Sequence, residues 1–431
     1  MSELHPEAGR RKRTAVREAE RRARALTAGA IVGVDAGKFK HCLVVRPRGG
    51  IDSRPFLFPV TREGFEKAEE FILRASGGVV PEDVLVGIEF AGVYGHTLAH
   101  YLHARGFQIV SVPPVFTKAG TRLSHTRSIK TDAKDAITIT TLVGNGSYRS
   151  FAFLRTSYME LRHLVSTRER LTSLRGAAIT RLKASLQVLW PEFESVFGDL
   201  KKKTAMAVLR AYPGPDDLLA ARKSTVMRLL RESSRNHLGE ATYEKLKSSA
   251  ERTLGLTSST SALKGEVRQM LKQIAFYGAR IKEVESVMVT TMEPLQEAQA
   301  LLTIPGVAPV AAATFLGSVG DPQSYHSSRQ VLALAGLSLT ENSSGQRQSR
   351  HRISKEGRPL IRRPAFMLGL RAVRTDGLYR AQYEGLLKRN VGRKLPAVIA
   401  IGRKVLRLMY SVARAQRAYT AEPPSHEKIA A

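Results

Sequence analysis

Residues 30–47 read AIVGVDAGKFKHCLVVRP, two short β-branched runs separated by Gly37. A third apolar run, RPFLFPV, follows at residues 54–60, and REGFEKAEEFILRA at 62–75 spaces its apolar residues as an amphipathic helix does. Turn-forming residues separate the three apolar runs, as they separate strands. The sequence therefore predicts three strands and then a helix.

Strand and helix patterns alternate in the next part of the chain. The segments are VLVGIEF at 84–90, GHTLAHYLHARG at 95–106, FQIVSVPP at 107–114 and KTDAKDAITITTLVG at 130–144. The strands VLVGI and IVGV are nearly all apolar, which is typical of strands covered on both faces. We therefore predict that residues 29–150 form an α/β domain, a ribonuclease-H-like mixed sheet covered by helices.

A helical region is expected at residues 151–295. Residues 157–190 contain no proline and repeat leucine at helical spacing, and beyond them the chain is polar and irregular to about Thr260. Apolar residues then follow at alternating steps of four and three, a heptad seam that predicts a coiled coil. This coiled coil can pair with 157–190 in the same chain or with another protomer. The seam consists of Leu263, Val267, Met270, Ile274, Tyr277, Ile281, Val284 and Met288.

A small, mostly helical C-terminal domain is expected at residues 296–395, followed by a basic helix and tail at 396–431. In LLTIPGVAPVAAATFLGSVG (301–320), Pro305-Gly306-Val307 interrupts two apolar helical runs. This pattern fits a helix-hairpin-helix element, whose turn offers backbone N–H groups and a helix N-terminus to a phosphate. An ordinary pair of packed helices fits it equally.

The charge of the chain favours a polyanionic partner. Its 431 residues carry 68 Lys and Arg against 38 Asp and Glu, a net charge of +30, with 43% hydrophobic residues. Residues 345–420 hold more than half of that excess, and residues 1–28 form a basic arm that is either mobile or helical. Nucleic acid is the usual partner of such a surface, and a membrane surface is the weaker alternative.

Other broad classes are excluded by composition. No run of eighteen apolar residues exists and the N-terminus lacks the apolar stretch of a signal peptide, so we expect a cytoplasmic protein. The single cysteine, Cys42, excludes an intrachain disulfide and a cysteine-based zinc cluster. Any metal must therefore be held by oxygen or histidine ligands.

Four carboxylates are placed as a two-metal nuclease site requires. Asp35 ends the first strand and Glu89 the fourth, and these strands are neighbours in the ribonuclease-H-like order. Asp132 and Asp135 lie three apart, on one face of a predicted helix. Together they could hold two Mg²⁺ or Mn²⁺ ions, which prefer oxygen ligands. Taken singly, each also fits a structural role as a cap, a surface charge or an ion-pair partner.

A second candidate site lies in the C-terminal domain. Asn342-Ser343-Ser344-Gly345 precedes Arg347, Arg350, Arg352 and Lys355. Cations beside a serine can stabilise the charge that develops when its hydroxyl attacks a phosphodiester. The same residues also fit a flexible Ser-Ser-Gly turn. With Arg362 and Arg363, these cations are the candidate nucleic-acid-binding residues.

These motifs together resemble the DEDD transposases of the insertion-sequence-110 family and the related site-specific DNA invertases. The first half matches through GVDAGK, GIEFAGVYG and KTDAKDA, and the second through LLTIPGV, ALAGL and SSGQRQSRHRISKEGRPLIRR. The matching segments cover about 29–150 and 296–390. Each is short, and their combination is specific.

The resemblance implies the function and its partners. In this family the tetrad, here Asp35, Glu89, Asp132 and Asp135, binds Mg²⁺, and a serine of the C-terminal domain attacks DNA to form a phosphoserine link. That serine maps onto Ser344, with Ser343 as the alternative. The resemblance further implies a composite active site assembled between chains of a dimer or tetramer, and a structured non-coding guide RNA that pairs with donor and target DNA.

Three other functions remain open on the sequence. A metal-dependent, junction-resolving nuclease would use the tetrad and water without Ser344. A tyrosine recombinase would use Arg350-His351-Arg352 and Tyr410 and no metal. A non-catalytic nucleic-acid-binding descendant of a transposase would bind in a salt-dependent way without any of the four carboxylates.

Overall fold

The computed structural model describes residues 6–90, 94–124, 131–151, 153, 156–340, 352–374, 377–389 and 392–420. The chain forms two compact units, Met1–Phe153 (unit 1) and Leu154–Ala431 (unit 2). Ser343, Ser344, Arg347 and Arg350 of the second candidate site lie outside the described residues, as does His351 of the tyrosine-recombinase alternative.

Unit 1 is built on a mixed sheet of six strands in the order β3-β2-β1-β4-β5-β6. The central strands β1 and β4 are parallel neighbours. At one edge β2 pairs antiparallel with β1 and β3 pairs antiparallel with β2, and at the other edge β6 pairs antiparallel with β5. This order is consistent with a ribonuclease-H-like domain, and the predicted α/β class is confirmed. The strands are β1 (Ala30–Ala36), β2 (Lys40–Pro47), β3 (Phe56–Pro59), β4 (Val84–Glu89), β5 (Gln108–Val112) and β6 (Arg149–Ser150).

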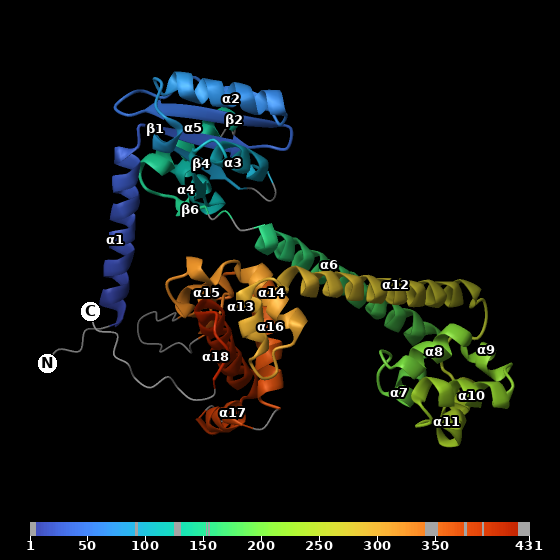
Figure 1. The fold of residues 1–431 in the computed structure, drawn as a ribbon. Helices are drawn as coiled ribbons and strands as arrows, with labels where there is room; N and C mark the ends of the chain where they lie inside the picture. Colours follow the sequence, from blue (N-terminus) through green and yellow to red (C-terminus); the bar gives the residue numbers. More distant parts are fainter. Residues whose placement is uncertain are drawn as a thin grey trace. The chain divides into compact units, whose positions relative to one another are not determined.

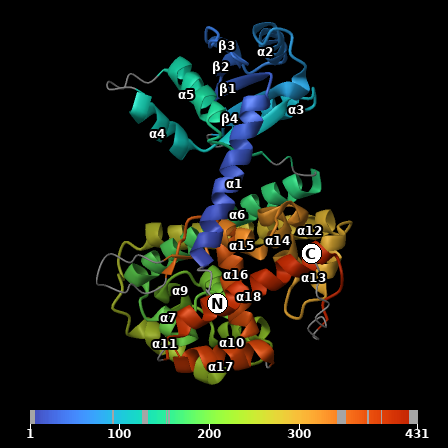
Figure 2. The ribbon, with the colours of Figure 1, turned by 90° about the vertical axis from the view of Figure 1, so that its left-hand side faces the viewer.

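Helices cover both faces of this sheet (Figure 2). The helices α2 and α3 lie on one face and α5 on the other, so the central strands are buried on both sides, as their apolar sequences predict. The basic arm is helical in the structure, and Ala25 near its end is buried. The helices are α1 (Pro6–Thr27), α2 (Arg62–Ala75), α3 (His96–His103), α4 (Pro114–Ser124) and α5 (Asp132–Gly144), with a 3-10 turn at Pro81–Asp83.

Two long helices form the centre of unit 2. The helices α6 (Thr156–Leu189) and α12 (Ser261–Met292) pack along each other (Figure 1). Every residue of the predicted seam on α12 is buried or half-buried, and five of them are core residues. Within the chain the seam lies along α6 and contributes to the cores at both ends of the helix pair.

A helical subdomain replaces the irregular stretch expected before Thr260, and that expectation was wrong. Five short helices gather at one end of the α6–α12 pair (Figure 1) around a core that includes Trp190 and Phe193. The helices are α7 (Phe193–Phe197), α8 (Lys203–Ala211), α9 (Pro215–Leu219), α10 (Lys223–Ser234) and α11 (Glu240–Glu251). In α8 and α10 the buried apolar residues do recur at helical spacing, as Ala205, Val208 and Leu209 show, so the sequence carries a local signal for these helices that the expectation missed.

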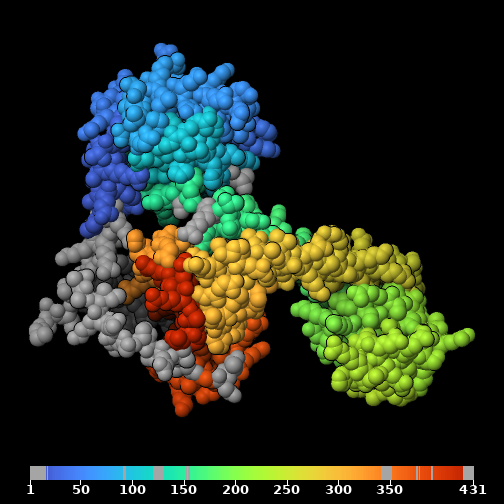
Figure 3. Space-filling view, viewed as in Figure 1, coloured from blue at the N-terminus to red at the C-terminus, as the bar shows by residue number. Residues whose placement is uncertain are grey.

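The C-terminal helices pack at the other end of the pair around the largest core of the unit. The space-filling view shows the α6–α12 pair as a narrower stretch between these two masses (Figure 3). The elements are α13 (Gln296–Leu302), α14 (Pro309–Val319), α15 (Ser328–Leu334), β7 (Leu339–Thr340), β8 (Arg352–Ile353), α16 (Pro359–Ala372), α17 (Leu378–Arg389) and α18 (Lys394–Ala415), with a 3-10 turn at Pro322–Ser324.

Within the described part of the chain, no helix is long and apolar enough to cross a membrane.

One buried group makes the stability of unit 1 depend on pH. His41 on β2 is buried against the rings of Phe58 and Phe65, with ring centroids 5.5 and 6.0 Å away, and this burial lowers its pKa. The folded state therefore disfavours the protonated imidazole. The resulting stability is complete above the pKa of an unfolded histidine, about 6.5, and is lost as the pH falls below it.

We therefore expect His41→Phe to flatten the fall in the free energy of unfolding between pH 7 and pH 5. Urea denaturation followed by far-UV circular dichroism measures this at each pH. His237→Phe, which replaces an exposed histidine, is the control and should keep the wild-type pH dependence. An unchanged slope in His41→Phe would show that His41 is not the titrating group.

Candidate active site

The carboxylates of the two central strands lie directly beside each other. Asp35 of β1 and Glu89 of β4 are register partners at the carboxyl ends of parallel strands. Neighbouring strands are about 4.8 Å apart, so the two side chains leave the sheet from adjacent positions. Both residues are half-buried. The expectation that the first and fourth strands are neighbours is confirmed.

Two glycines show which face these carboxylates share. A Cβ atom at Gly33 would overlap Thr140 and the carbonyl oxygen of Ala136, and one at Gly87 would overlap Val143. Both glycines therefore face α5. Because side chains alternate along a strand, Asp35 and Glu89, two residues further on, face α5 as well.

The helix α5 runs back along β1, with its first turn at the carboxyl end of the strand. Ala136 packs on Cys42 and Val44 near that end, whereas Gly144 at the end of the helix lies near Ile31. The helix starts at Asp132, and the Thr131 side chain caps it by accepting from Lys134 N at 3.3 Å. Asp132 and Asp135 thus lie at the same edge and face as the strand-end carboxylates.

The electrostatics of Cys42 agree with this arrangement. Cys42 is the register partner of Asp35 on β2 and is buried. Burial first, and then the negative charges of Asp132 and Asp35, raise the pKa of the thiol to about 11. Two of the four carboxylates, one from the sheet and one from the helix, therefore act on the same buried sulfur.

The four carboxylates suit a hard divalent cation in their chemistry, because all their ligand atoms are oxygens. Asp135 is buried, whereas Asp132 is exposed at the helix start. Among the residues that the structure describes, no three His, Cys, Asp or Glu side chains are close enough to hold one ion. The four carboxylates therefore match a divalent cation in ligand type and lie at the same edge and face of the sheet. A metal ion would have to draw their side chains together.

Aromatic packing fixes the backbone on the other side of Glu89. Phe90, the next residue, stacks on Phe151 with ring centroids 4.5 Å apart and lies 4.7 Å from the ring of His96. Phe153 in turn stacks on His103 at 3.7 Å. The sequence did not predict this cluster, because Phe151 and Phe153 are some sixty residues from Glu89 and no local pattern links them.

In unit 2 the segments 334–336 and 355–358 form a tight double turn. Lys355, in the left-handed region at φ 56°, donates its N–H to Gly336 O at 3.0 Å, and Arg358 N donates to Leu334 O at 2.7 Å. The half-buried Arg362 donates to the carbonyls of Ala335 and Lys355 at 3.2 and 3.1 Å. The ALAGL and SKEG motifs are thus held together by Arg362.

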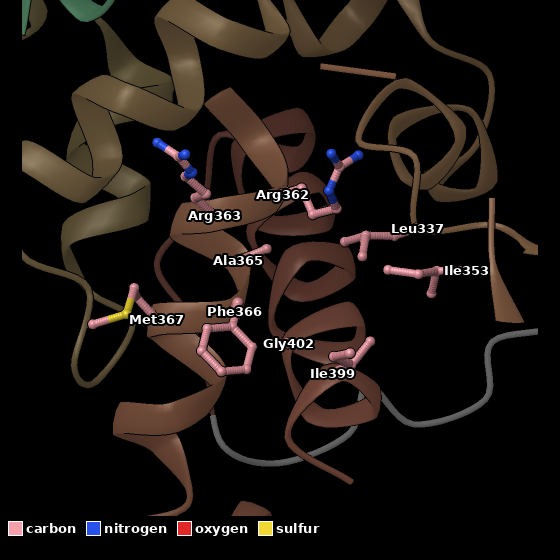
Figure 4. Close-up of a pocket in the computed structure, with 9 residues that line it drawn as sticks. All are labelled: Leu337, Ile353, Arg362, Arg363, Ala365, Phe366, Met367, Ile399 and Gly402. Carbon is pink, nitrogen blue, oxygen red and sulfur yellow. The ribbon is translucent and has the colours of Figure 1, made fainter. Parts of the chain in front are cut away.

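The hairpin of β7 and β8 brackets the candidate serine segment. Thr340 pairs with the exposed Arg352, on either side of residues 341–351. A pocket of about 320 Å³ lies beside this hairpin, between α16 and α18 (Figure 4). Figure 4 shows Arg362 and Arg363 directed to opposite sides of α16, and the exposed Arg363 pairs with Glu169 of α6. The lining residues are Leu337, Ile353, Arg362, Arg363, Ala365, Phe366, Met367, Ile399 and Gly402.

Tyr410, the residue that a tyrosine recombinase would need, lies in the core of unit 2. Its side chain is 4% exposed, its hydroxyl donates to Tyr325 O at 2.8 Å, and Arg414 donates to the same hydroxyl at 2.8 Å. A nucleophile must reach its substrate. This burial counts against Tyr410 as the attacking group.

A mixed sheet of this order, with carboxylates ending its two central strands, is consistent with the ribonuclease-H-like class of nucleic-acid enzymes. Two family models match the chain, the DEDD transposase model of the IS110 type at residues 32–191 and the model for transposases of the IS116/IS110/IS902 family at residues 298–384. Together they span more than half of the sequence. The chain belongs to the IS110 family of DEDD transposases and is a DNA transposase of an insertion sequence.

Three relatives encoded by insertion elements, each described as uncharacterized, match the chain over most of their length. The chain is 26% identical to a 44.8 kDa protein of insertion element IS116 from Streptomyces clavuligerus, over 91% of this chain and 96% of the relative. It is 24% identical to a 42 kDa protein of IS900 from Mycobacterium paratuberculosis, over 90% and 96%. A 43.6 kDa protein of IS110 from Streptomyces coelicolor is 22% identical over 70% and 75%.

The contact between α5 and Gly33 should be essential to the position of the carboxylates. In Gly33→Ala the added methyl group meets the backbone of α5, which cannot move aside as a side chain can. We expect a destabilisation of about 1–3 kcal/mol, as for other overpacked cores. Chemical denaturation of the full-length protein measures it.

Gly144→Ala is the matched control on α5 itself. A Cβ atom there finds its nearest neighbours at 3.5 and 3.7 Å, ordinary contact distances. The control should change stability by about 1 kcal/mol or less. Equal stability of Gly33→Ala and wild type would refute the close contact.

Proposed function

We propose that this transposase cuts and rejoins DNA through Ser344, with Asp35, Glu89, Asp132 and Asp135 holding Mg²⁺ or Mn²⁺. The observation that carries the proposal is the shared edge and face of the four carboxylates, which α5 and the paired strands β1 and β4 set together. When bound, the metal would neutralise charge on the reacting phosphate. Ser343 is the alternative nucleophile.

A serine nucleophile suits recombination for an energetic reason. The Ser344 oxygen forms a bond to phosphorus while the bond from phosphorus to one DNA oxygen breaks, and the serine proton leaves to a base as the departing oxygen gains one. The phosphoserine ester keeps the energy of the original phosphodiester. A DNA hydroxyl can then attack the ester, which frees the serine and rejoins strands without ATP.

Basic residues around the candidate serine would hold the nucleic acid backbone. Arg347, Arg350, Arg352, Lys355 and Arg363 supply this charge in our proposal. The exposed positions of Arg352 and Lys355 support such contacts. Arg362 would contribute chiefly by holding the turn that carries Lys355, since it already donates to two carbonyls.

The proposal also includes an oligomeric assembly and a guide RNA. We propose that α6 and α12 act as a coiled-coil arm in an assembly of two or four chains, and that a structured non-coding RNA guides the enzyme. Because the seam of α12 is already buried against α6, protomers would meet through other faces of the arm. The helices α13 and α14, joined by a turn with Gly306 at φ 84°, would act as a helix-hairpin-helix element.

Trapping of a covalent intermediate tests the proposed chemistry. Full-length protein is incubated with DNA of the element ends, RNA transcribed from those ends, and Mg²⁺, and adducts are resolved on a denaturing gel. We expect a protein–DNA adduct that disappears in Ser344→Ala and in Asp35→Ala, because both the nucleophile and the metal ligands are needed. Ser343→Ala is the matched control and should retain the adduct.

Cleavage that persists in Ser344→Ala without any adduct would contradict the serine mechanism. It would identify a nuclease that uses water at the same carboxylates. Binding without cleavage, unchanged in all the variants, would indicate a non-catalytic protein.

Tyr410→Phe separates our proposal from a tyrosine recombinase. The change removes one hydroxyl and its hydrogen bonds to Tyr325 O and Arg414, at a cost of about 1 kcal/mol of stability. Strand transfer by Tyr410→Phe should nevertheless stay within about twofold of wild type under conditions where both are folded, a difference of about 0.4 kcal/mol in the barrier. Complete loss of transfer in a folded variant would favour Tyr410 as the nucleophile.

A further inference from the structure

A second pocket of unit 2 gathers arginines from two distant parts of the chain. It has a volume of about 500 Å³ and lies between the long helices α6 and α12 and the helices α14 and α16. Its apolar lining residues include Val310, Ala311 and Leu368. Four arginines line it, namely Arg168 of α6 and Arg363, Arg371 and Arg374 from α16 and the turn that follows it.

Two carboxylates in the same pocket neutralise part of this charge. Arg168 pairs with Glu285 of α12 at 2.7 Å, and their side chains are only 30% and 26% exposed. Arg363 pairs with Glu169, and here the arginine is 70% exposed. The described lining of the pocket thus holds four guanidinium groups and two carboxylates, those of Glu285 and Glu169.

Arg371 contacts the turn before α14. Arg371 donates to Gly306 O at 3.2 Å, and its side-chain stem lies 3.9 Å from the position of a Cβ atom on Gly306. Arg374 follows three residues later, just past the end of α16, and is exposed. The helix α14 begins at the same pocket with Pro309, so its dipole adds to the positive potential.

We propose that this pocket binds a phosphate of the DNA backbone through Arg371 and Arg374. In the free protein Glu169 pairs with Arg363, and a DNA phosphate replaces Glu169 as the partner of Arg363 when DNA binds. The planar guanidinium fork matches a phosphate in geometry as well as charge. The Arg363 side chain is 70% exposed and that of Glu169 is 30% exposed, so solvent screens the pair in part and lowers the cost of exchanging Glu169 for a phosphate. This inference rests on the proposed function, because it requires that the enzyme binds DNA.

DNA is the favoured ligand because the chain is a DNA transposase. The sequence motifs point to the basic residues 347–363, and they include none of Arg168, Arg371 and Arg374. The convergence of these three arginines depends on tertiary structure alone, because Arg168 and Arg371 are some two hundred residues apart.

Salt-dependent binding of full-length protein to a short double-stranded DNA, followed by fluorescence anisotropy, tests the pocket. Removing one arginine that binds a phosphate should reduce the slope of log K against log salt by about 1. We expect the double variant Arg371→Ala/Arg374→Ala to bind about tenfold more weakly, with a slope smaller by about 2. Arg374→Ala alone, at the exposed end of the pocket, should show about half of that slope change.

Glu169→Gln should have the opposite effect and bind DNA about threefold more tightly, since it releases Arg363. Glu283→Gln is the matched control. Glu283 pairs with Arg280 on an exposed face of α12, and neither residue lines the pocket, so the same removal of one negative charge should leave affinity near wild type. Circular dichroism checks that each variant is folded.

Wild-type affinity and slope in folded Arg374→Ala would overturn the proposal, as would a Glu169→Gln variant that binds no more tightly than Glu283→Gln. Weaker binding of a single-stranded RNA probe by the arginine variants, with DNA binding unchanged, would overturn it in favour of RNA. Failure of the wild-type protein itself to bind DNA would instead contradict the proposed function.

Discussion

The close contact between α5 and the central strands of the sheet controls the geometry of unit 1. At Gly33 and Gly87 there is no room for even one methyl group between strand and helix. The helix axis is therefore fixed in height above β1 and β4, and its first turn is fixed at their carboxyl ends. Asp132 and Asp135 are carried to the edge where Asp35 and Glu89 leave the sheet.

In unit 2, close backbone contact at glycines also positions the basic motifs. A Cβ atom at Gly402 of α18 would lie 2.6 Å from Ala365 O of α16, so these helices cross in backbone contact. The double turn of Gly336 and Lys355 packs beside that crossing. Short motifs that are separate in sequence thus become one rigid base for the hairpin that brackets residues 341–351.

Much of unit 1 could be predicted because its signals are local. Strands β1 and β4 are continuous apolar runs, α2 and α5 have clear starts, and the acids follow the strands directly. By contrast the two-residue β6 is too short to show a pattern. The short helices α7–α11 were missed although α8 and α10 space their apolar residues as amphipathic helices do. The strand-end and helix-start positions of the four carboxylates were predictable, whereas their common face depends on Gly33 and Gly87.

Binding of Mn²⁺ to the full-length protein, measured as loss of the free-ion electron paramagnetic resonance signal, tests most directly whether the four carboxylates form one site. Asp83→Asn is the matched comparison, because Asp83 precedes β4 at the opposite edge of the sheet. Wild type and Asp83→Asn should bind alike, and Asp35→Asn should bind at least about tenfold more weakly. Equal binding by all three proteins would contradict a metal site at this edge.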